Sequence, residues 1–360
     1  MDWTYAQFRT IYQFGYKFSS PVIPVQGVET MHSPHKFFES LKDVFGSNKA
    51  SIQSHTPEAG RTKSASELFD YTLRQLGGSF ATSRIPQAIS SLAEYDRELA
   101  LHICETLYRI RNYDIQAYTS TIRNLIYMSE EFLELQSELE RLGHYRYSSF
   151  DEVKKSVIDN PTIMEGRYLD ALFLSQSFWP NHNRILSFFI ENFCRNLKPA
   201  GSMLEVPCGS GVFSLEFLMR NRWEATLCDL SEYSVAFSKT ILESCGIEKA
   251  QFVYRNVFDL DENVRFDRII CGELLEHLEN PQALLDKLHR LLKDDGMIFL
   301  TTAVWAAAID HIYLFEDVKS VDEMIEKRFK FVKKLVLPLN PAADPNQSRI
   351  PINYAAILIK

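Results

Sequence analysis

Apolar residues recur at helical spacing through the first part of the chain. One aromatic stripe joins Tyr5, Phe8, Tyr12 and Tyr16, and two longer stripes run from Ile85 to Ile110 and from Ile122 to Leu142, just before Gly143. Residues three and four positions apart share one face of an α-helix, so each stripe predicts an amphipathic helix. Such helices, with no chemistry of their own, are typical of a cap over a site or of a dimer interface. We expect residues 1–160 to form a helical domain of this kind.

Polar residues mark where two of these helices begin or are interrupted. Ser64-Ala65-Ser66-Glu67 has the spacing of a capping box, in which the serine side chain accepts from the backbone of Glu67 and the glutamate reaches back. The helix that starts there should end at Gly77-Gly78. Asp96 interrupts the stripe from Ile85 to Ile110. A substrate contact and a structural acid with its own partner both fit Asp96, and we favour the second.

Short apolar runs alternate with amphipathic stretches in the second part of the chain, residues 161–360. An apolar, aromatic segment at 168–193 is broken at Trp179-Pro180, which predicts a helix on each side. Strands are predicted at 203–205, 225–229, 251–255, 266–271, 296–302, 331–337 and 354–359, and helices at 231–245, 281–292 and 317–327. This alternation predicts an α/β fold with a doubly wound, mostly parallel sheet that includes an antiparallel C-terminal strand, the last two strands forming an antiparallel hairpin at the edge.

Composition narrows the class of protein. The 360 residues are 46% hydrophobic, so the chain can bury a large core. A formal net charge of −8 argues against a general nucleic-acid-binding protein, which would carry a basic face. The six cysteines form no C-x-x-C pair, and several fall in predicted strands, as expected of reduced core residues. Because we find neither a signal peptide nor a long apolar run, we expect a soluble, cytoplasmic protein.

The stretch M-L-E-V-P-C-G-S-G-V at residues 203–212 is the clearest candidate for a binding site. A short strand reaches Glu205, and a glycine turn then leads into a helix that begins near Val212. Glycines let a ligand approach the backbone, and a helix N-terminus offers unpaired N–H groups. The acid at the strand end favours a ligand that carries a hydroxyl or an ammonium group there.

Further polar residues follow the other predicted strands. In a doubly wound sheet the ligand lies beyond the carboxyl ends of the strands. Asp229 ends the second strand, 24 residues after Glu205, where an acid can accept from ribose hydroxyls. Asn256 and Val257 follow the third strand, Gly272-Glu273-Leu274-Leu275-Glu276-His277 follows the fourth, and His311 follows the fifth. Four polar groups in the apolar helices, Tyr168, Gln176, Asn181 and His182, either line the outer side of the ligand or are satisfied core residues.

These motifs resemble those of the class I, Rossmann-like S-adenosylmethionine-dependent methyltransferases. E-V-P-C-G-S-G at 205–211 matches their acidic glycine motif, F-D-R-I-I-C-G-E-L-L-E-H at 266–277 their fourth-strand motif, and L-L-K-D-D-G at 291–296 the turn before the fifth strand. The resemblance covers residues 165–360 and is closest to enzymes that methylate small molecules, including quinone precursors. A dinucleotide dehydrogenase fits less well, because Ser214 stands where its third glycine is required.

The resemblance implies roles for individual residues. Glu205 would bind the methionine end of S-adenosylmethionine, Gly209 and Gly211 would let it lie against the backbone, and Asp229 would take the ribose hydroxyls. Asn256 replaces the usual aspartate at the adenine amine, and Pro207 replaces the first glycine of the motif. The implied cofactor-binding set is Glu205, Pro207, Cys208, Gly209, Gly211, Asp229, Leu230, Asn256, Val257 and Gly272.

His277 and His311 are the candidate catalytic bases, since both should lie near the methyl group. Glu273, Glu276, His277 and His311 also resemble the metal site of methyltransferases that act on the 2′-hydroxyl at small-RNA 3′ ends. Two carboxylates and two imidazoles suit Mg²⁺ or Mn²⁺, which would polarise an acceptor hydroxyl. The alternative is that this run only packs and caps the turn after the fourth strand.

Three functions are consistent with these features. The first is a methyltransferase acting on an oxygen, or less readily a nitrogen, of a small secondary metabolite, as a homodimer through the N-terminal helices. The second is a metal-dependent RNA 2′-O-methyltransferase, which the acidic charge disfavours. The third is a non-catalytic, cofactor-binding interaction protein. We favour the first, with a small-molecule acceptor and with neither membrane nor nucleic acid as a partner.

Overall fold

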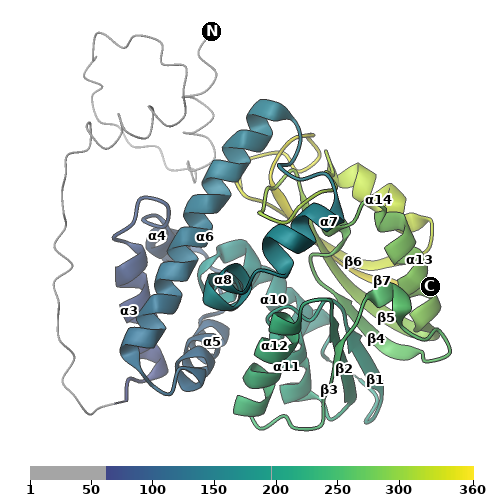
Figure 1. Ribbon diagram of the computed structural model, residues 1–360, viewed down its shortest axis with the longest axis horizontal. Helices are drawn as coiled ribbons and strands as arrows, with labels where there is room; N and C mark the ends of the chain where they lie inside the picture. The colour runs from purple at the N-terminus through teal and green to yellow at the C-terminus, as the bar shows by residue number, and fades with distance from the viewer. Residues whose placement is uncertain (1–61, 196) are drawn as a thin grey trace. The chain divides into compact units, whose positions relative to one another are not determined.

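The computed structural model of the protein describes residues 62–195 and 197–360 (Figure 1). The aromatic stripe at Tyr5–Tyr16 lies outside these residues. The α-helices are α3 Ala65–Leu76, α4 Ile85–Ser91, α5 Arg97–Ile110, α6 Ile115–Leu142, α7 Phe150–Val153, α8 Pro161–Ile163, α9 Leu169–Phe178, α10 Pro180–Asn192, α11 Val212–Arg220, α12 Glu232–Ser244, α13 Pro281–Leu291 and α14 Val318–Glu326. Short π-helical turns, η1 Lys154–Ile158 and η2 Met164–Tyr168, and 3₁₀ turns, η3 Val257–Asp259 and η4 Leu275–His277, complete the helical elements.

Capping residues place the helix ends where the sequence predicts them. Ser64 and Glu67 form the reciprocal capping box at the start of α3, and α3 ends at Leu76 before Gly77. Gly143 ends α6 in the left-handed conformation, with φ +76°, which glycine adopts at little cost. The segment Trp179-Pro180 separates α9 from α10, because proline cannot continue the hydrogen-bonding of the helix before it.

The stripe from Ile85 to Ile110 forms two helices, α4 and α5, and not one. Asp96 is the N-cap of α5, and its carboxylate accepts from the Leu99 N–H at 2.9 Å. The Asn183 side chain holds the same residue from α10: it accepts from the Asp96 N–H at 2.9 Å and donates to the Asp96 carbonyl at 3.1 Å. Asp96 is therefore the structural acid that the sequence favoured.

One seven-stranded sheet organises the second part of the chain. Its strands are β1 Ser202–Glu205, β2 Glu224–Asp229, β3 Gln251–Tyr254, β4 Phe266–Cys271, β5 Leu292–Val304, β6 Lys330–Pro338 and β7 Ile352–Ile359. They lie in the order β3-β2-β1-β4-β5-β7-β6, and β7 runs antiparallel to both of its neighbours while the other pairings are parallel. The predicted doubly wound α/β fold is confirmed. The strand order reverses between β1 and β4, which is where such sheets bind ligands.

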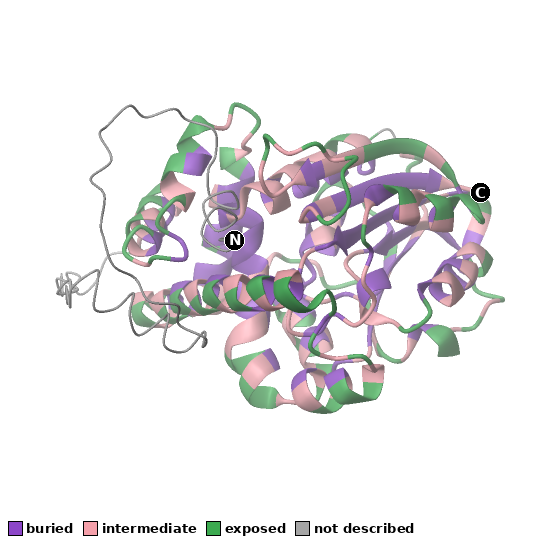
Figure 2. Cartoon of the chain, turned by 90° about the horizontal axis from the view of Figure 1, so that it is seen from above, coloured by how far each residue is buried: buried purple, intermediate pink, exposed green. Residues whose placement is uncertain are grey.

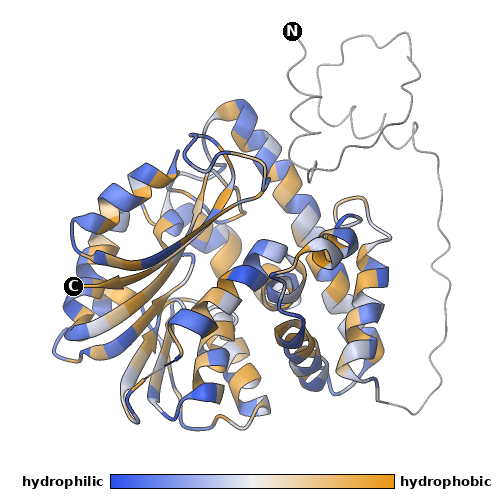
Figure 3. Cartoon of the chain, turned by 180° about the vertical axis from the view of Figure 1, so that it is seen from behind, coloured by the Kyte–Doolittle hydropathy of each residue, from blue (hydrophilic) through white to orange (hydrophobic). Residues whose placement is uncertain are grey.

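The inner strands of the sheet are buried on both faces, as Figures 2 and 3 show by their buried, apolar residues, whereas the outer strands β3 and β6 are more exposed. Successive residues of a strand point to opposite faces. Met203 of β1 accordingly belongs to a core cluster with residues of α9, α10 and α11, whereas Leu204 belongs to a second cluster with residues of α13 and α14. Burial on both sides explains why the strands read as continuous apolar runs.

The N-terminal helices share the first of these cores. Helix α5 contacts α9 and α12, and α6 contacts α9. A buried acid supports this packing, since Asp170 of α9 pairs with Arg111 and accepts from the Thr121 hydroxyl of α6 at 3.0 Å. Residues 63–360 belong to one compact unit, and the domain boundary between residues 160 and 161 stays a prediction. Within the described part of the chain, every helix is too short or too polar to cross a bilayer.

Candidate functional site

The glycine turn leaves β1 at its carboxyl end and enters α11. The Glu205 carboxylate is buried and accepts from the Ser214 N–H, in the first turn of α11, at 3.1 Å. The Val206–Pro207 peptide is cis, and the next N–H, that of Cys208, donates to the Cys228 carbonyl of β2 at 3.0 Å. The turn is thus fixed to both neighbouring elements, with its acid directed at the helix N-terminus.

The two glycines of the turn meet different surroundings. Gly209 has φ +47°, and a Cβ placed there would meet only Leu172 Cδ2, at 3.9 Å. Gly211 has φ +73°, and a Cβ there would lie 2.7 Å from the Ser238 Cβ. Gly209 therefore borders open space that a ligand can approach, whereas the close packing of the turn on α12 requires Gly211. The resemblance had given both glycines the same role.

Residues at the ends of three further strands surround the turn. Asp229 ends β2 with one carboxylate oxygen accepting from the Gly209 N–H at 2.9 Å and the other from the Ser231 N–H at 2.8 Å. Beside it, Leu230 is half-buried. After β3, Asn256 accepts from the Phe258 N–H at 3.0 Å and caps η3, where Val257 is buried. Gly272 follows β4, and a Cβ there would lie 3.2 Å from the Phe213 ring. The fold brings the predicted cofactor-binding residues together at the carboxyl ends of the parallel strands. Their binding roles stay predictions.

Two buried acids, Glu205 and Asp229, determine the electrostatics at the carboxyl ends of the strands. Burial raises the pKa of Glu205 to about 8, although its bond to Ser214 opposes the shift. Burial also raises the pKa of Asp229, against the lowering effect of the N–H groups of Gly209 and Ser231. Each carboxylate would be stabilised by a nearby cation or by additional hydrogen-bond donors. The edge therefore favours a ligand with an ammonium or sulfonium group and hydroxyls.

Replacing Glu205 with glutamine should change how stability depends on pH. The ordinary pKa of 4.5 is raised to about 8 in the folded protein, so the folded state holds a proton that the unfolded chain releases between these values. Stability from this group is therefore lost as pH rises through that window. We expect Glu205→Gln and the wild type to melt together at about pH 5, and the variant to melt about 2 °C or more higher above about pH 8.

Differential scanning fluorimetry measures this difference, with Glu248→Gln on the exposed surface as the matched control. A melting difference between Glu205→Gln and the wild type that does not vary with pH would contradict the assigned pKa shift.

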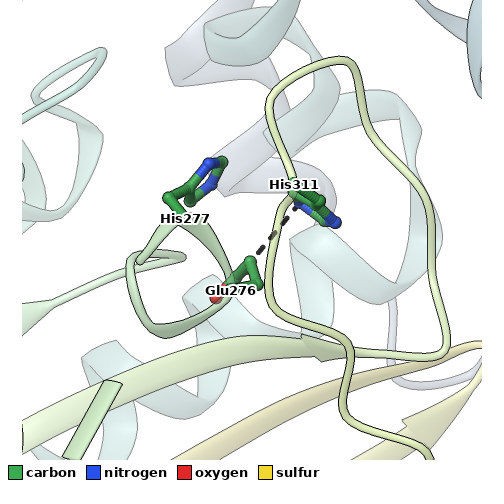
Figure 4. A group of neighbouring side chains, drawn as sticks. All are labelled: Glu276, His277 and His311. Carbon is green, nitrogen blue, oxygen red and sulfur yellow. Dashed lines mark ion pairs between the residues drawn. The ribbon is translucent and has the colours of Figure 1, made fainter. Parts of the chain in front are cut away.

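A second group of side chains lies beyond the ends of β4 and β5 (Figure 4). Glu276 and His277 are in η4, and His311 is in the segment after β5. One ligand atom from each of the three lies within 4.8 Å of the others. The Nδ1 atom of His277 lies 2.9 Å from the Asp310 carbonyl, and that of His311 lies 2.9 Å from the Ala306 carbonyl. Since carbonyls only accept, both Nδ1 atoms donate, and in a neutral imidazole with that tautomer the Nε2 atom carries the lone pair.

Glu276 of this group interacts with the carboxyl of a neighbouring acid, Glu273. Glu276 accepts from the Thr302 hydroxyl at 2.6 Å and from the Ala303 N–H at 3.2 Å. Burial, together with the neighbouring Glu273, raises the pKa of Glu276 well above its usual range. Glu273 lies outside the three-residue group, but its carboxyl is a hydrogen-bonding partner of Glu276. Burial lowers the pKa of His311 to about 4, so its imidazole is neutral at physiological pH.

Asp310 is a candidate site residue that the sequence analysis missed. It is buried, and one carboxylate oxygen accepts from the Tyr168 hydroxyl at 3.2 Å and lies 3.7 Å from the His277 Nδ1. The other oxygen has no hydrogen-bond partner among the described residues. Its position directly before His311 was the available signal. Tyr168, for which both an outer ligand contact and a satisfied core residue were expected alternatives, bonds to Asp310 and so meets the histidine group through it.

A pocket of about 130 Å³ lies beside this group. Its walls come from α4, α6, the junction of α9 and α10, the segment after β5, and the β6–β7 connection with the start of β7. Asn181 and His182 line it, and Gln176 contacts His182 at 3.3 Å as well as Leu172 and Ser175 of α9. Ala306 connects the pocket to the histidines, because it lines the pocket and its carbonyl accepts from His311.

Comparison with known proteins defines the class. Residues 204–298 match the family model of a methyltransferase domain. This stretch holds the glycine turn, Asp229 and the E-L-L-E-H run, so the predicted class I methyltransferase domain is confirmed. The predicted class of enzyme, a methyltransferase, is also that of the relatives that the chain matches.

The relatives are mainly O-methyltransferases. The chain is 34% identical over 102 residues to a ubiquinone biosynthesis O-methyltransferase of Dechloromonas aromatica, covering 28% of this chain and 43% of the relative. It is 30% identical over 169 residues to the mitochondrial ubiquinone biosynthesis O-methyltransferase of Saccharomyces cerevisiae, covering 46% and 52%. The chain spans about half the length of these relatives. The N-terminal domain of EvdMO1, solved with SAH bound, is 18% identical with a TM-score of 0.37, covering 49% of this chain and 79% of that one.

Proposed function

We propose that the protein transfers the methyl group of S-adenosylmethionine to an oxygen atom of a small, largely apolar acceptor. The observation that carries this proposal is the glycine turn of a methyltransferase domain with two buried acids, Glu205 and Asp229, at one edge of the sheet. The similarity to O-methyltransferases of ubiquinone biosynthesis supports oxygen as the acceptor atom.

The chain's contribution to such a reaction is positioning. S-adenosylmethionine supplies an activated methyl group on a sulfonium. Gly209 leaves space for the cofactor beside the turn, Asp229 would accept from its ribose hydroxyls, and Glu205, whose carboxyl ionises more readily beside a positive charge, would accept from its ammonium group. A displacement at a methyl carbon requires donor and acceptor in line, and holding two reactants in that geometry can account for most of the acceleration.

The pocket beside the histidines is the proposed acceptor site. Phe132 and Trp179 give it aromatic walls, and α4 adds aliphatic ones. The Trp179 indole is held in place by its N–H, which donates to the Ser129 hydroxyl at 3.3 Å. Asn181, which bonds to Asn353 at 3.1 Å, supplies a polar edge. A flat, apolar molecule with a hydroxyl fits these walls, and His277 or His311 would take the hydroxyl proton.

The group of Glu276, His277 and His311 fits a divalent cation. Metal-binding histidines usually donate their second ring N–H to a carbonyl or carboxylate, and both imidazoles here do so. Asp310 adds a buried carboxylate oxygen without a partner among the described residues. Mg²⁺ or Mn²⁺ held here, with Glu273 beside it, would polarise an acceptor hydroxyl.

We expect the purified protein to bind about one Mn²⁺ per chain by isothermal titration calorimetry, as the one such donor group among residues 62–195 and 197–360 implies. His311→Ala should weaken that binding by about 100-fold or more, because it removes a metal ligand and not merely a residue that hydrogen-bonds to one. His289→Ala on α13 is the matched control and should bind as the wild type does. Absence of Mn²⁺ binding, together with activity that EDTA leaves unchanged, would remove the metal from the proposal.

The test of the function follows labelled methyl groups. Protein, methyl-labelled S-adenosylmethionine and a panel of hydroxylated aromatic and aliphatic compounds are incubated, and products are identified by mass spectrometry. We expect label on an oxygen of at least one small compound. Trp179→Ala should raise the KM for that acceptor while leaving the affinity for S-adenosylhomocysteine unchanged. If label appeared on added RNA and not on small compounds, the acceptor would be RNA and not a small molecule. Failure to bind S-adenosylhomocysteine would overturn the proposal.

A further inference from the structure

Cys245 differs from the other cysteines of the chain. It is the C-cap of α12 and is half-buried, whereas the other five cysteines are fully buried. Helix α12 begins beside Asp229 and runs for 13 residues, which is about 20 Å. Cys245 therefore lies at the opposite end of the helix from the proposed cofactor edge, and the methyl-transfer site does not account for its surroundings.

Helix α5 presents polar and charged groups to this thiol. The Arg109 guanidinium lies 3.6 Å from the Cys245 sulfur and donates to the Ser244 carbonyl at 3.1 Å. The Thr106 hydroxyl lies 3.8 Å from the sulfur. His102 precedes Thr106 by one turn of α5, and its imidazole contributes to lowering the pKa of the Cys245 thiol. Donors and a permanent cation thus surround the sulfur atom.

A buried acid orients this imidazole. The Nδ1 atom of His102 lies 3.0 Å from Glu216 Oε1, and the Glu216 side chain of α11 is 1% exposed. The other oxygen of Glu216 pairs with Arg220 at 2.5 Å. Carboxylate, imidazole and thiol therefore follow one another across α11, α5 and α12. This is the order in which a third group orients a base beside a nucleophile.

The charges favour the thiolate. Burial would raise the pKa of Cys245, but hydrogen bonds from His102, Ser244 and Thr106 outweigh it and lower that pKa. The bonds of His102 to Cys245 and then to Glu216 raise the pKa of the imidazole to about 9. The C-terminus of α12 would repel an anion, and Arg109 and the protonated His102 offset that repulsion. Burial by contrast raises the pKa of Cys104 to about 12.

Helix capping alone does not explain the arrangement. The Arg109 bond to the Ser244 carbonyl satisfies the end of α12 and accounts for that arginine. It does not account for the buried Glu216 that orients His102, or for the imidazole beside the sulfur. Thiols that are partly exposed and held beside cations are the reactive ones in proteins.

We propose that Cys245 is a nucleophilic modification site that reacts with soft electrophiles and with peroxides. With hydrogen peroxide, the thiolate sulfur attacks one oxygen, an S–O bond forms and the O–O bond breaks. The sulfur is oxidised to a sulfenic acid and the peroxide is reduced. The departing hydroxide takes the proton of the His102 imidazolium and leaves as water, so His102 ends neutral.

Alkylation of the folded protein tests this proposal. The whole protein is treated with limiting iodoacetamide at pH 7 and its cysteine peptides are quantified by mass spectrometry. We expect Cys245 to be labelled before the five buried cysteines, and severalfold faster in the folded protein than in guanidinium, because the lowered pKa of the folded thiol increases its thiolate fraction. This comparison needs no variant.

Variants test whether the reactivity of Cys245 depends on the His102 imidazole. His102→Gln should slow alkylation of Cys245 roughly tenfold, and His289→Gln, a half-exposed histidine on α13, should leave it unchanged. Dimedone should trap a sulfenic acid on Cys245 after peroxide treatment, and Cys245→Ser should abolish the adduct. Labelling of Cys245 that is slower in the folded protein than in the unfolded chain, or that His102→Gln leaves unchanged, would overturn the proposal.

Discussion

Replacing Asp229 with alanine should lower the affinity of the protein for S-adenosylhomocysteine by roughly 10- to 100-fold, the value of one or two hydrogen bonds to a charged group. The carboxylate already accepts from the N–H groups of Gly209 and Ser231, so it is fixed at the end of β2 before any ligand arrives. Each carboxylate oxygen can accept a further hydrogen bond, and the ribose hydroxyls would supply it.

Two further variants separate binding from folding in this experiment. Asp229→Asn keeps the shape of the side chain and should lose less affinity than the alanine variant. Asp294→Ala changes an exposed acid at the opposite edge of the sheet and should bind as the wild type does. Isothermal titration calorimetry measures all four proteins. Equal affinities for Asp229→Ala and the wild type would remove Asp229 from the cofactor site.

The second large effect concerns the two glycines of the turn. Replacing one of them with alanine should mainly lower stability, and replacing the other should mainly lower cofactor affinity. Gly211→Ala combines φ +73° with a contact of 2.7 Å to the Ser238 Cβ. We expect it to lower the free energy of unfolding by about 2–5 kcal/mol. Gly209→Ala at φ +47° meets only Leu172, so the loss should be about 1–2 kcal/mol, while affinity for S-adenosylhomocysteine falls.

Gly246→Ala is the matched control for this pair. It has φ +78° and no atom within 4 Å of the added Cβ, so it isolates the cost of the backbone conformation. Urea unfolding gives the free energies, and calorimetry gives the affinities. If Gly211→Ala were no less stable than Gly246→Ala, α12 would not restrict this turn. If Gly209→Ala bound S-adenosylhomocysteine normally, the cofactor would not pass beside Gly209.

The sheet and the glycine turn could be predicted because their signals are local. Residues buried on both faces of a strand leave an apolar run, and Ile269-Ile270-Cys271 is such a run in β4, whose predicted bounds coincide with the observed ones. The start of β5 was less visible. It begins at Leu292, four residues before the predicted start at Gly296, because the polar Lys293-Asp294-Asp295 segment reads as a turn.

Other features depend on contacts between distant segments. Asp96 interrupts the apolar stripe without showing that the helix itself ends there, and the break between α4 and α5 is held by Asn183, which is 87 positions away. His102 and Glu216 are 114 positions apart, and no spacing in the sequence associates them with Cys245. The role of Asp310 depends on how the segment after β5 folds back to His277.

The antiparallel β7 has a consequence for how this protein could diversify. Its direction places Ile352 opposite Val304, so the first residues of the last strand join the carboxyl ends of the parallel strands and line the pocket. Apart from Ala306 and the junction of α9 and α10, the pocket walls come from α4, α6 and the segment from Leu339 to Asn353. None of these lies within residues 204–298. If the pocket holds the acceptor, substrate range can drift by substitutions in these outlying segments, while the stretch that binds the methyl donor remains unaltered.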